Sequence, residues 1–98
     1  MAAYLFQLEL SELNDEVAAT IPLHREVVNK LFAEGRILSY SVSIHRNMIW
    51  CVLNAADEQE AMELILAMPL YQHFSEVQCH ALLFHNTLPA ILPGLSLN

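Results

Sequence analysis

Charged residues are scarce in this 98-residue chain, and basic residues are the scarcest of them. Only 15% of the residues are charged, where about 25% is usual in globular domains. Four residues are basic and eleven are acidic, so the net charge is −7. A nucleic-acid-binding domain needs a basic stripe, and a protein that binds anionic membranes needs a basic patch. The sequence therefore predicts neither nucleic acid nor membrane as a partner.

Cysteine is also rare, and long apolar runs are missing. Cys51 and Cys79 are too few for the disulfide framework of a small secreted domain, and free thiols are typical of cytoplasmic proteins. No apolar run approaches the roughly 18 residues that span a bilayer. The first ten residues lack the basic start of a signal peptide. We therefore expect a cytoplasmic protein.

Hydrophobic residues, by contrast, are in excess. They make up 55% of the chain, against about 45–50% in a typical domain. This composition excludes a disordered chain, and it indicates more apolar surface than one small domain can bury. We therefore expect a homo-oligomer.

No repeat or linker interrupts the sequence, so residues 1–98 are predicted to form one domain. Pro89, Pro93 and Gly94 make residues 86–98 an irregular C-terminal tail, expected to dock on a neighbouring subunit.

Hydrophobic periodicity predicts six elements in the order β-α-β-β-α-β. Alternating residues predict strands over 3–10, 37–45, 48–54 and 76–85. Apolar stripes at helical spacing predict helices over 15–34 and from 57 to the residue before Pro69. Pro22 favours a break in the first helix near Thr20. Arg46 and Asn47 are predicted to form a two-residue hairpin turn, with Asn47 suited to positive φ.

This order is that of the ferredoxin-like fold, an α+β architecture in which two helices cover one face of a four-stranded antiparallel sheet. The other face of the sheet would be bare in a monomer, and a second subunit packed sheet against sheet would cover it. Strand alternation predicts which side chains this open face carries. They are Leu5, Gln7, Ser41, Ser43, His45, Trp50, Val52, His80 and Leu82.

Residues 68–85, MPLYQHFSEVQCHALLFH, resemble the closing segment of the muconolactone isomerase family, and the match extends without gaps back to residues 34–35. The resemblance implies a dimeric α/β barrel, assembly into larger oligomers, and a proton shift within an unsaturated lactone without metal or cofactor. The matching positions are Pro69, Leu70, Tyr71, Glu76, Ala81, Leu82 and His85.

The sequence departs from that family at its arginines. Ser41 and Val42 stand where the family has a Trp-Arg pair, and Phe84 stands where it has an Arg before the closing His. A carboxylate-bearing substrate would pair with such arginines. The resemblance therefore implies the fold more strongly than the family's substrate.

The candidate site lies in the sheet cleft. His45 and His80 are the candidate general bases, because imidazole gains and loses a proton near neutral pH. Trp50 would form an apolar floor, and hydrogen bonds to a carbonyl or carboxylate would come from Gln7, Ser41 and Ser43. No two histidines have the spacing of a ready-made metal site, so we expect no metal and no cofactor.

Three functions fit these residues. The first is binding of a small, partly apolar carbonyl or lactone compound by a muconolactone isomerase-like protein, with or without cofactor-free isomerase activity; the polar lining of the cleft favours it. The second is a non-catalytic ligand-binding or scaffold protein of the same fold, which the missing arginines favour. The third is a cofactor-independent oxygenase.

Overall fold

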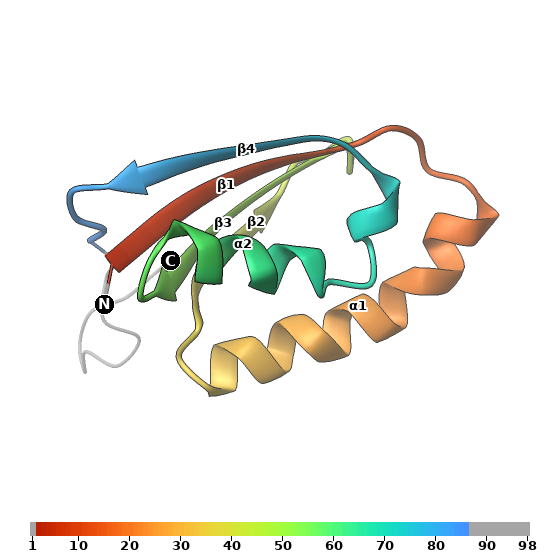
Figure 1. Cartoon of the computed structure of the whole chain (residues 1–98). Coiled ribbons are helices and arrows are strands. Elements are labelled where there is room, and N and C mark those ends of the chain that lie inside the picture. The colour runs from red at the N-terminus through yellow and green to blue at the C-terminus, as the bar shows by residue number, and fades with distance from the viewer. Residues whose placement is uncertain (1, 87–98) are drawn as a thin grey trace, which may run out of the picture.

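The computed structural model describes residues 2–86 as four strands and two α-helices in the predicted order (Figure 1). The predicted tail lies outside these residues, apart from Asn86. A single 3₁₀ turn, Tyr71–His73, precedes the last strand. The elements are β1 (Ala2–Leu10), α1 (Asp15–Ala33), β2 (Ile37–Val42), β3 (Met48–Ala55), α2 (Glu58–Leu66) and β4 (Phe74–Leu82).

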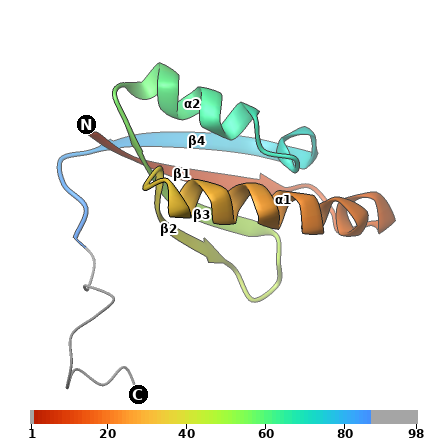
Figure 2. The same ribbon diagram turned by 90° about the horizontal axis from the view of Figure 1, so that it is seen from below.

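The four strands form one antiparallel sheet in the order β2-β3-β1-β4. Both helices lie on the same face of this sheet, as the view from below shows (Figure 2). The α+β, ferredoxin-like fold expected from the sequence is thus confirmed. One consequence concerns the thiols: β1 separates Cys51 from Cys79, because Phe6 pairs with both of them from opposite sides, and both cysteines are free.

The core lies between the sheet and the two helices. Tyr4, Phe6, Leu8 and Leu10 alternate along β1 and are all buried, as expected for a strand with one covered face. Side chains of β3 and of both helices complete the core. The largest fully buried side chains of the core are Phe6, Leu8, Val17, Ile49, Cys51, Leu53 and Ile65.

Side chains at the helix ends fix where the helices begin and stop. The Asn14 side chain accepts a hydrogen bond from the Val17 backbone N–H at 2.9 Å, and Asp57 accepts from the Glu60 N–H at 2.8 Å. Both bonds satisfy donors that a helix start otherwise leaves free. Gly35, with φ 73°, ends the first helical segment in the left-handed conformation that glycine tolerates.

The predicted break at Pro22 is wrong, because α1 runs without interruption from Asp15 to Ala33. Proline removes one backbone hydrogen bond from a helix interior. The buried side chains on both sides of it, Val17, His24, Val28 and Leu31, form one stripe against the sheet. Packing of this stripe stabilises the helix through the proline, since tertiary contacts supply most helical stability in proteins.

The predicted two-residue turn between β2 and β3 is also wrong. Ser41 pairs with Trp50, and the Ser43 N–H donates to the Met48 carbonyl at 2.9 Å. Residues 44–47 therefore form the turn, and β2 ends at Val42 instead of His45. Arg46, with φ 63°, takes the left-handed conformation that was predicted for Asn47. The register differs from the predicted one by two residues, so the faces of Ser41 and Trp50 are unchanged.

Within residues 2–86, no helix is long and apolar enough to cross a membrane.

Candidate functional site

The open face of the sheet carries most of the predicted site residues in two rows across the strands. The first row is Ser41, Trp50, Gln7 and Gln78, and the second is Ser39, Val52, Leu5 and His80. Gln7, Ser41, Trp50 and His80 thus lie on one face, as strand alternation predicts. The Trp50 side chain is 36% exposed, so this face presents an aromatic surface to its surroundings.

The polar groups at the centre of this face bind one another. The Trp50 Nε1–H donates to the Gln7 Oε1 at 3.3 Å. An indole has only this one donor, so a ligand on the open face would have to displace Gln7 to use it.

Ser43 and His45 lie outside this group, in and beside the β2–β3 turn. The Ser43 hydroxyl accepts from the Met48 N–H at 3.0 Å and donates to the Asn47 Oδ1 at 3.0 Å. Its hydrogen bonds therefore close the turn. His45 is exposed and lies beyond the last residue pair of the hairpin.

His45 and His80 are not brought together within one protomer. His80 pairs with Leu5, whereas the turn lies beyond the Glu9–Met48 pair. Four residues along β1 correspond to about 14 Å, and the three strand spacings between β2 and β4 add about 14 Å at right angles. A separation of about 20 Å exceeds what one small ligand bridges.

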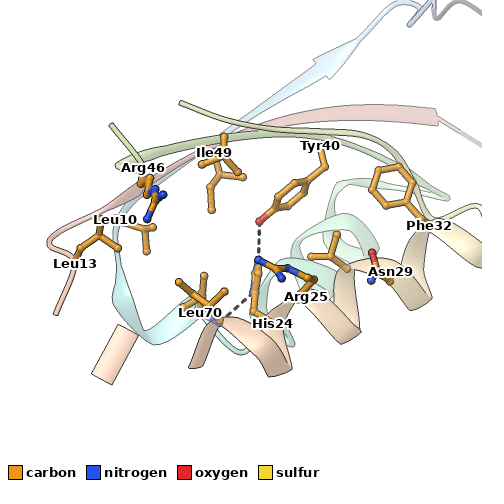
Figure 3. Close-up of a pocket in the computed structure, with 13 residues that line it drawn as sticks. Leu10, Leu13, His24, Arg25, Asn29, Phe32, Tyr40, Arg46, Ile49 and Leu70 are labelled. Carbon is orange, nitrogen blue, oxygen red and sulfur yellow. Dashed lines mark hydrogen bonds between the residues drawn. The ribbon is translucent and has the colours of Figure 1, made fainter. Parts of the chain in front are cut away.

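A cavity of about 600 Å³ lies on the opposite, helix-covered side of the sheet (Figure 3). Its walls come from α1, from β2 and β3, from the turn between them and from Leu70. Apolar side chains predominate: Leu10, Leu13, Ile21, Val28, Phe32, Val42, Ile49 and Leu70. The polar members are His24, Arg25, Asn29, Tyr40 and Arg46.

His24 and Tyr40 meet inside this cavity. The His24 Nε2 and the Tyr40 hydroxyl lie 2.8 Å apart, and the Leu70 backbone N–H donates to the His24 Nδ1 at 3.4 Å (Figure 3). His24 is only 4% exposed and is the one buried polar side chain of residues 2–86. Three elements distant in sequence are thus connected through one imidazole.

We assign the tautomer of His24 from these contacts. A ring nitrogen that accepts a hydrogen bond carries no proton, so a neutral ring that accepts at Nδ1 holds its proton on Nε2. The Nε2–H then donates to the Tyr40 oxygen. Tyr40 accepts this bond, and its own hydroxyl proton has no acceptor among the described residues. The arrangement leaves one unused donor in the cavity.

Burial keeps both groups uncharged. It lowers the pKa of His24 from 6.5 to about 4, because a desolvated imidazolium is disfavoured. Burial also raises the pKa of Tyr40, and the negative charge of Cys51, when ionised, raises it further. At neutral pH the pair is therefore a neutral imidazole and a protonated phenol. Such a phenol can donate a hydrogen bond to a carbonyl oxygen without supplying charge.

Sequence reasoning missed this pair, although both residues carried a signal. His24 occupies the core stripe of α1, spaced seven residues after Val17 and four before Val28, and a polar residue in such a stripe needs a partner. Tyr40 alternates with Ser39 and Ser41, so strand alternation puts it on the face opposite to theirs. Neither the helical stripe of α1 nor the alternation of β2 shows which strand α1 packs across, so the sequence did not predict that His24 and Tyr40 meet.

Among residues 2–86, no three His, Cys, Asp or Glu side chains lie close enough to hold an ion.

A solved structure shares this fold. The chain is similar to 5-chloro-2-hydroxyhydroquinone dehydrochlorinase from Burkholderia phenoliruptrix AC1100, solved in complex with 2,5-dihydroxybenzoquinone. The TM-score is 0.61 at 9% sequence identity, over 80% of this chain and 90% of that one. No family model matches the sequence, and no curated protein matches it. The likeness supports the fold that the muconolactone isomerase resemblance implies, while membership of that family stays a prediction.

Proposed function

We propose that the protein binds a small, partly apolar carbonyl compound in the cavity between α1 and the sheet. The Tyr40 hydroxyl donates a hydrogen bond to the carbonyl oxygen of the ligand. The observation that carries this proposal is the His24–Tyr40 contact of 2.8 Å, since it leaves the phenol proton free in a mostly apolar cavity.

The lining of the cavity supports this choice of ligand. Small-molecule sites are typically apolar clefts of about 300–1,000 Å³ with a few placed polar groups. The structurally similar dehydrochlorinase binds a quinone, a ring compound with carbonyl groups. That likeness supports a carbonyl ligand here, and the residues of the cavity supply the donor for it.

Binding is better supported than catalysis. A proton-shifting isomerase needs a base beside the carbon that loses its proton. None of the acidic residues lines the cavity. His24, the one imidazole there, is a poor base because burial lowers its pKa to about 4. We therefore favour the non-catalytic, ligand-binding function over the isomerase.

The open sheet face is the second candidate site. Exposed Trp50, hydrogen-bonded to Gln7, favours a site there. Its floor would be formed by Trp50, its hydrogen bonds by Gln7 and Ser41, and its general base would be His80. A homodimer packed sheet against sheet would enclose this site. His45 of the same copy is too distant from His80 to act with it, so a second general base would be His45 of the other copy. If the protein is a cofactor-free isomerase of an unsaturated lactone, the reaction would take place at this open-face site.

A titration separates the two sites. We expect 2,5-dihydroxybenzoquinone, added to the ¹⁵N-labelled protein, to shift the amide signals of His24, Asn29 and Tyr40 and to leave those of Gln7, Trp50 and His80 unchanged. Shifts confined to the second group would move the site to the open face. No shift in either group would contradict ligand binding.

A second measurement tests the isomerase. An unsaturated lactone incubated with the protein in D₂O should incorporate no solvent deuterium above the uncatalysed rate. Enzyme-dependent exchange that His80→Ala abolishes would favour the isomerase on the open face.

The homodimer is tested independently. In sedimentation velocity at micromolar concentration we expect no 11.1 kDa species. A clean monomer would remove the enclosure that the open-face site needs, and it would leave the α1–sheet cavity intact.

A further inference from the structure

We infer that the cavity takes its ligand as an anion, with the negative charge held between Arg25 and Arg46. The ligand class is then a small ring compound that carries both a carbonyl group and an acidic group, such as a carboxylate or an ionised enol. This inference rests on the proposed function, because it concerns the ligand of the same cavity.

The charges of the chain are divided unevenly around the cavity. The protein has eleven acidic and four basic residues. No acidic residue lines the cavity, whereas two of the four basic residues do. A site lined at random in so acidic a chain would contain more carboxylates than arginines. The cavity is instead a positively charged region of a negatively charged molecule, and it attracts anions.

Both guanidinium groups are available to a ligand. Among residues 2–86, the one ion pair joins Arg36 to Glu60 at 2.6 Å. Arg25 and Arg46 make no side-chain hydrogen bond within that part of the chain and are exposed, so they lie at the mouth of the cavity. Arginine presents several donors in a planar fork, which matches a carboxylate or enolate.

The two arginines approach from opposite walls (Figure 3). Arg25 follows His24 on α1, and Arg46 comes from the turn between β2 and β3. Arg46 has φ 63°, a conformation that is uncommon for residues with a Cβ and that Asn or Gly adopts more easily. Asn47, which suits this left-handed conformation better, is the next residue, yet Arg46 is the residue that adopts it. A role for the Arg46 side chain accounts for this choice.

The geometry assigns different parts of the ligand to different depths. His24, Ile49 and Leu70 are buried, and the Tyr40 donor lies beside them. The arginines are at the solvent-exposed end. A ligand with a carbonyl at one end and an ionised oxygen at the other would satisfy both, with its ring against the apolar wall.

Two quinones form a matched pair of probes. The hydroxyl groups of 2,5-dihydroxybenzoquinone are conjugated with its carbonyls and are ionised at neutral pH. 2,5-Dimethoxybenzoquinone has the same ring and carbonyls but no acidic proton. We expect the dimethoxy compound to bind at least about tenfold more weakly at pH 7, as measured by calorimetry. Raising the salt concentration should weaken only the dihydroxy compound.

Variants of the two arginines complete the experiment. Arg25→Gln and Arg46→Asn should each weaken the dihydroxy compound about fivefold or more and leave the dimethoxy compound unchanged. The Asn variant also suits the left-handed backbone at that position. Lys30→Gln is the control, because it removes an exposed cation of α1 that does not line the cavity. It should change neither affinity by more than about twofold.

The outcomes separate this inference from the proposed function. If both quinones bind in the cavity with equal affinity, or if the arginine variants bind the dihydroxy compound like wild type, the anion inference is overturned and carbonyl binding stands. If neither quinone shifts the amide signals of His24 and Tyr40, the proposed function fails as well.

Discussion

The two faces of the sheet carry polar side chains in opposite circumstances. On the open face, the Trp50 donor is occupied by Gln7 at 3.3 Å. On the helix-covered face, His24 occupies the Tyr40 oxygen and leaves the phenol proton without a protein acceptor among the described residues. The open face has the greater number of polar residues. The covered face has the unused donor, the mostly apolar cavity and the two arginines that line it.

This difference shows that the number of polar residues is a poor guide to a binding site. Polar groups at a surface satisfy one another or bind water at little cost. A donor in a mostly apolar cavity has few alternatives, so a ligand acceptor that reaches it gains more. We therefore place the ligand beside Tyr40, and the following predictions test the contrast between the two faces.

The largest expected effect is on the pH dependence of stability. His24 has a pKa of about 4 in the folded protein and 6.5 as its ordinary value. Between these values the unfolded state binds the proton more tightly, so stability falls as the pH falls from about 6.5 to about 4. The loss attributable to His24 is about 3 kcal/mol, and it is absent above pH 6.5.

The measurement is urea unfolding at pH 7 and pH 4 for wild type and for His24→Gln, which cannot titrate. We expect wild type to lose about 3 kcal/mol more than the variant between these pH values. Equal losses would show that His24 is not kept neutral by burial. Ser41→Ala, which changes a non-titrating residue of the open face, is the control and should lose as much as wild type.

The next effect is the loss of the buried hydrogen bonds at neutral pH. His24→Leu leaves the Leu70 N–H and the Tyr40 hydroxyl without their partner, which should lower the free energy of unfolding by about 1–3 kcal/mol. His80→Leu, on the exposed side of β4, should change it by less than about 0.5 kcal/mol. A reversed order would contradict the larger contribution that we assign to the buried hydrogen bonds of His24.

A smaller effect is expected on ligand binding. Tyr40→Phe removes the unused donor, and it should weaken 2,5-dihydroxybenzoquinone about tenfold, the value of one hydrogen bond of about 1.4 kcal/mol. Ser41→Ala changes a neighbouring residue that faces the other side of the sheet, and it should leave the affinity unchanged. Calorimetry on both variants checks this. Weakening by Ser41→Ala alone would contradict the choice of face.

The smallest effect is expected for Gln7→Ala. Its hydrogen bond to Trp50 is long and exposed, so the free energy of unfolding should fall by less than about 0.5 kcal/mol. The tryptophan fluorescence should report the change even where stability does not. A loss above 1 kcal/mol would show that this pair supports the open face far more than its geometry implies.

Much of the fold was accessible from the sequence because it depends on local periodicity. Alternation along β1 predicted its buried face, and apolar stripes at helical spacing predicted both helices close to their observed bounds. The turn length was not accessible. A shift of two residues keeps every side chain on its face, so the pattern of β2 and β3 fits a two-residue turn and a four-residue turn equally well.

The candidate site was less accessible because it depends on packing between elements. His24 and Tyr40 are sixteen residues apart, and only the crossing of α1 over β2 brings them together. Pro22 favoured a broken helix, and that prediction separated His24 from Val17, the first residue of its stripe. The open-face residues Gln7, Ser41, Trp50 and His80 were predicted correctly, because strand alternation alone determines which face of a sheet a side chain occupies.

A crystal structure of the complex with 2,5-dihydroxybenzoquinone tests the central claim most directly. The account predicts density for the ring between α1 and β2, with a carbonyl oxygen within hydrogen-bond distance of the Tyr40 hydroxyl and with the His24 Nε2 still on the Tyr40 oxygen. A ring stacked on Trp50, with the α1–sheet cavity free of ligand, would contradict it.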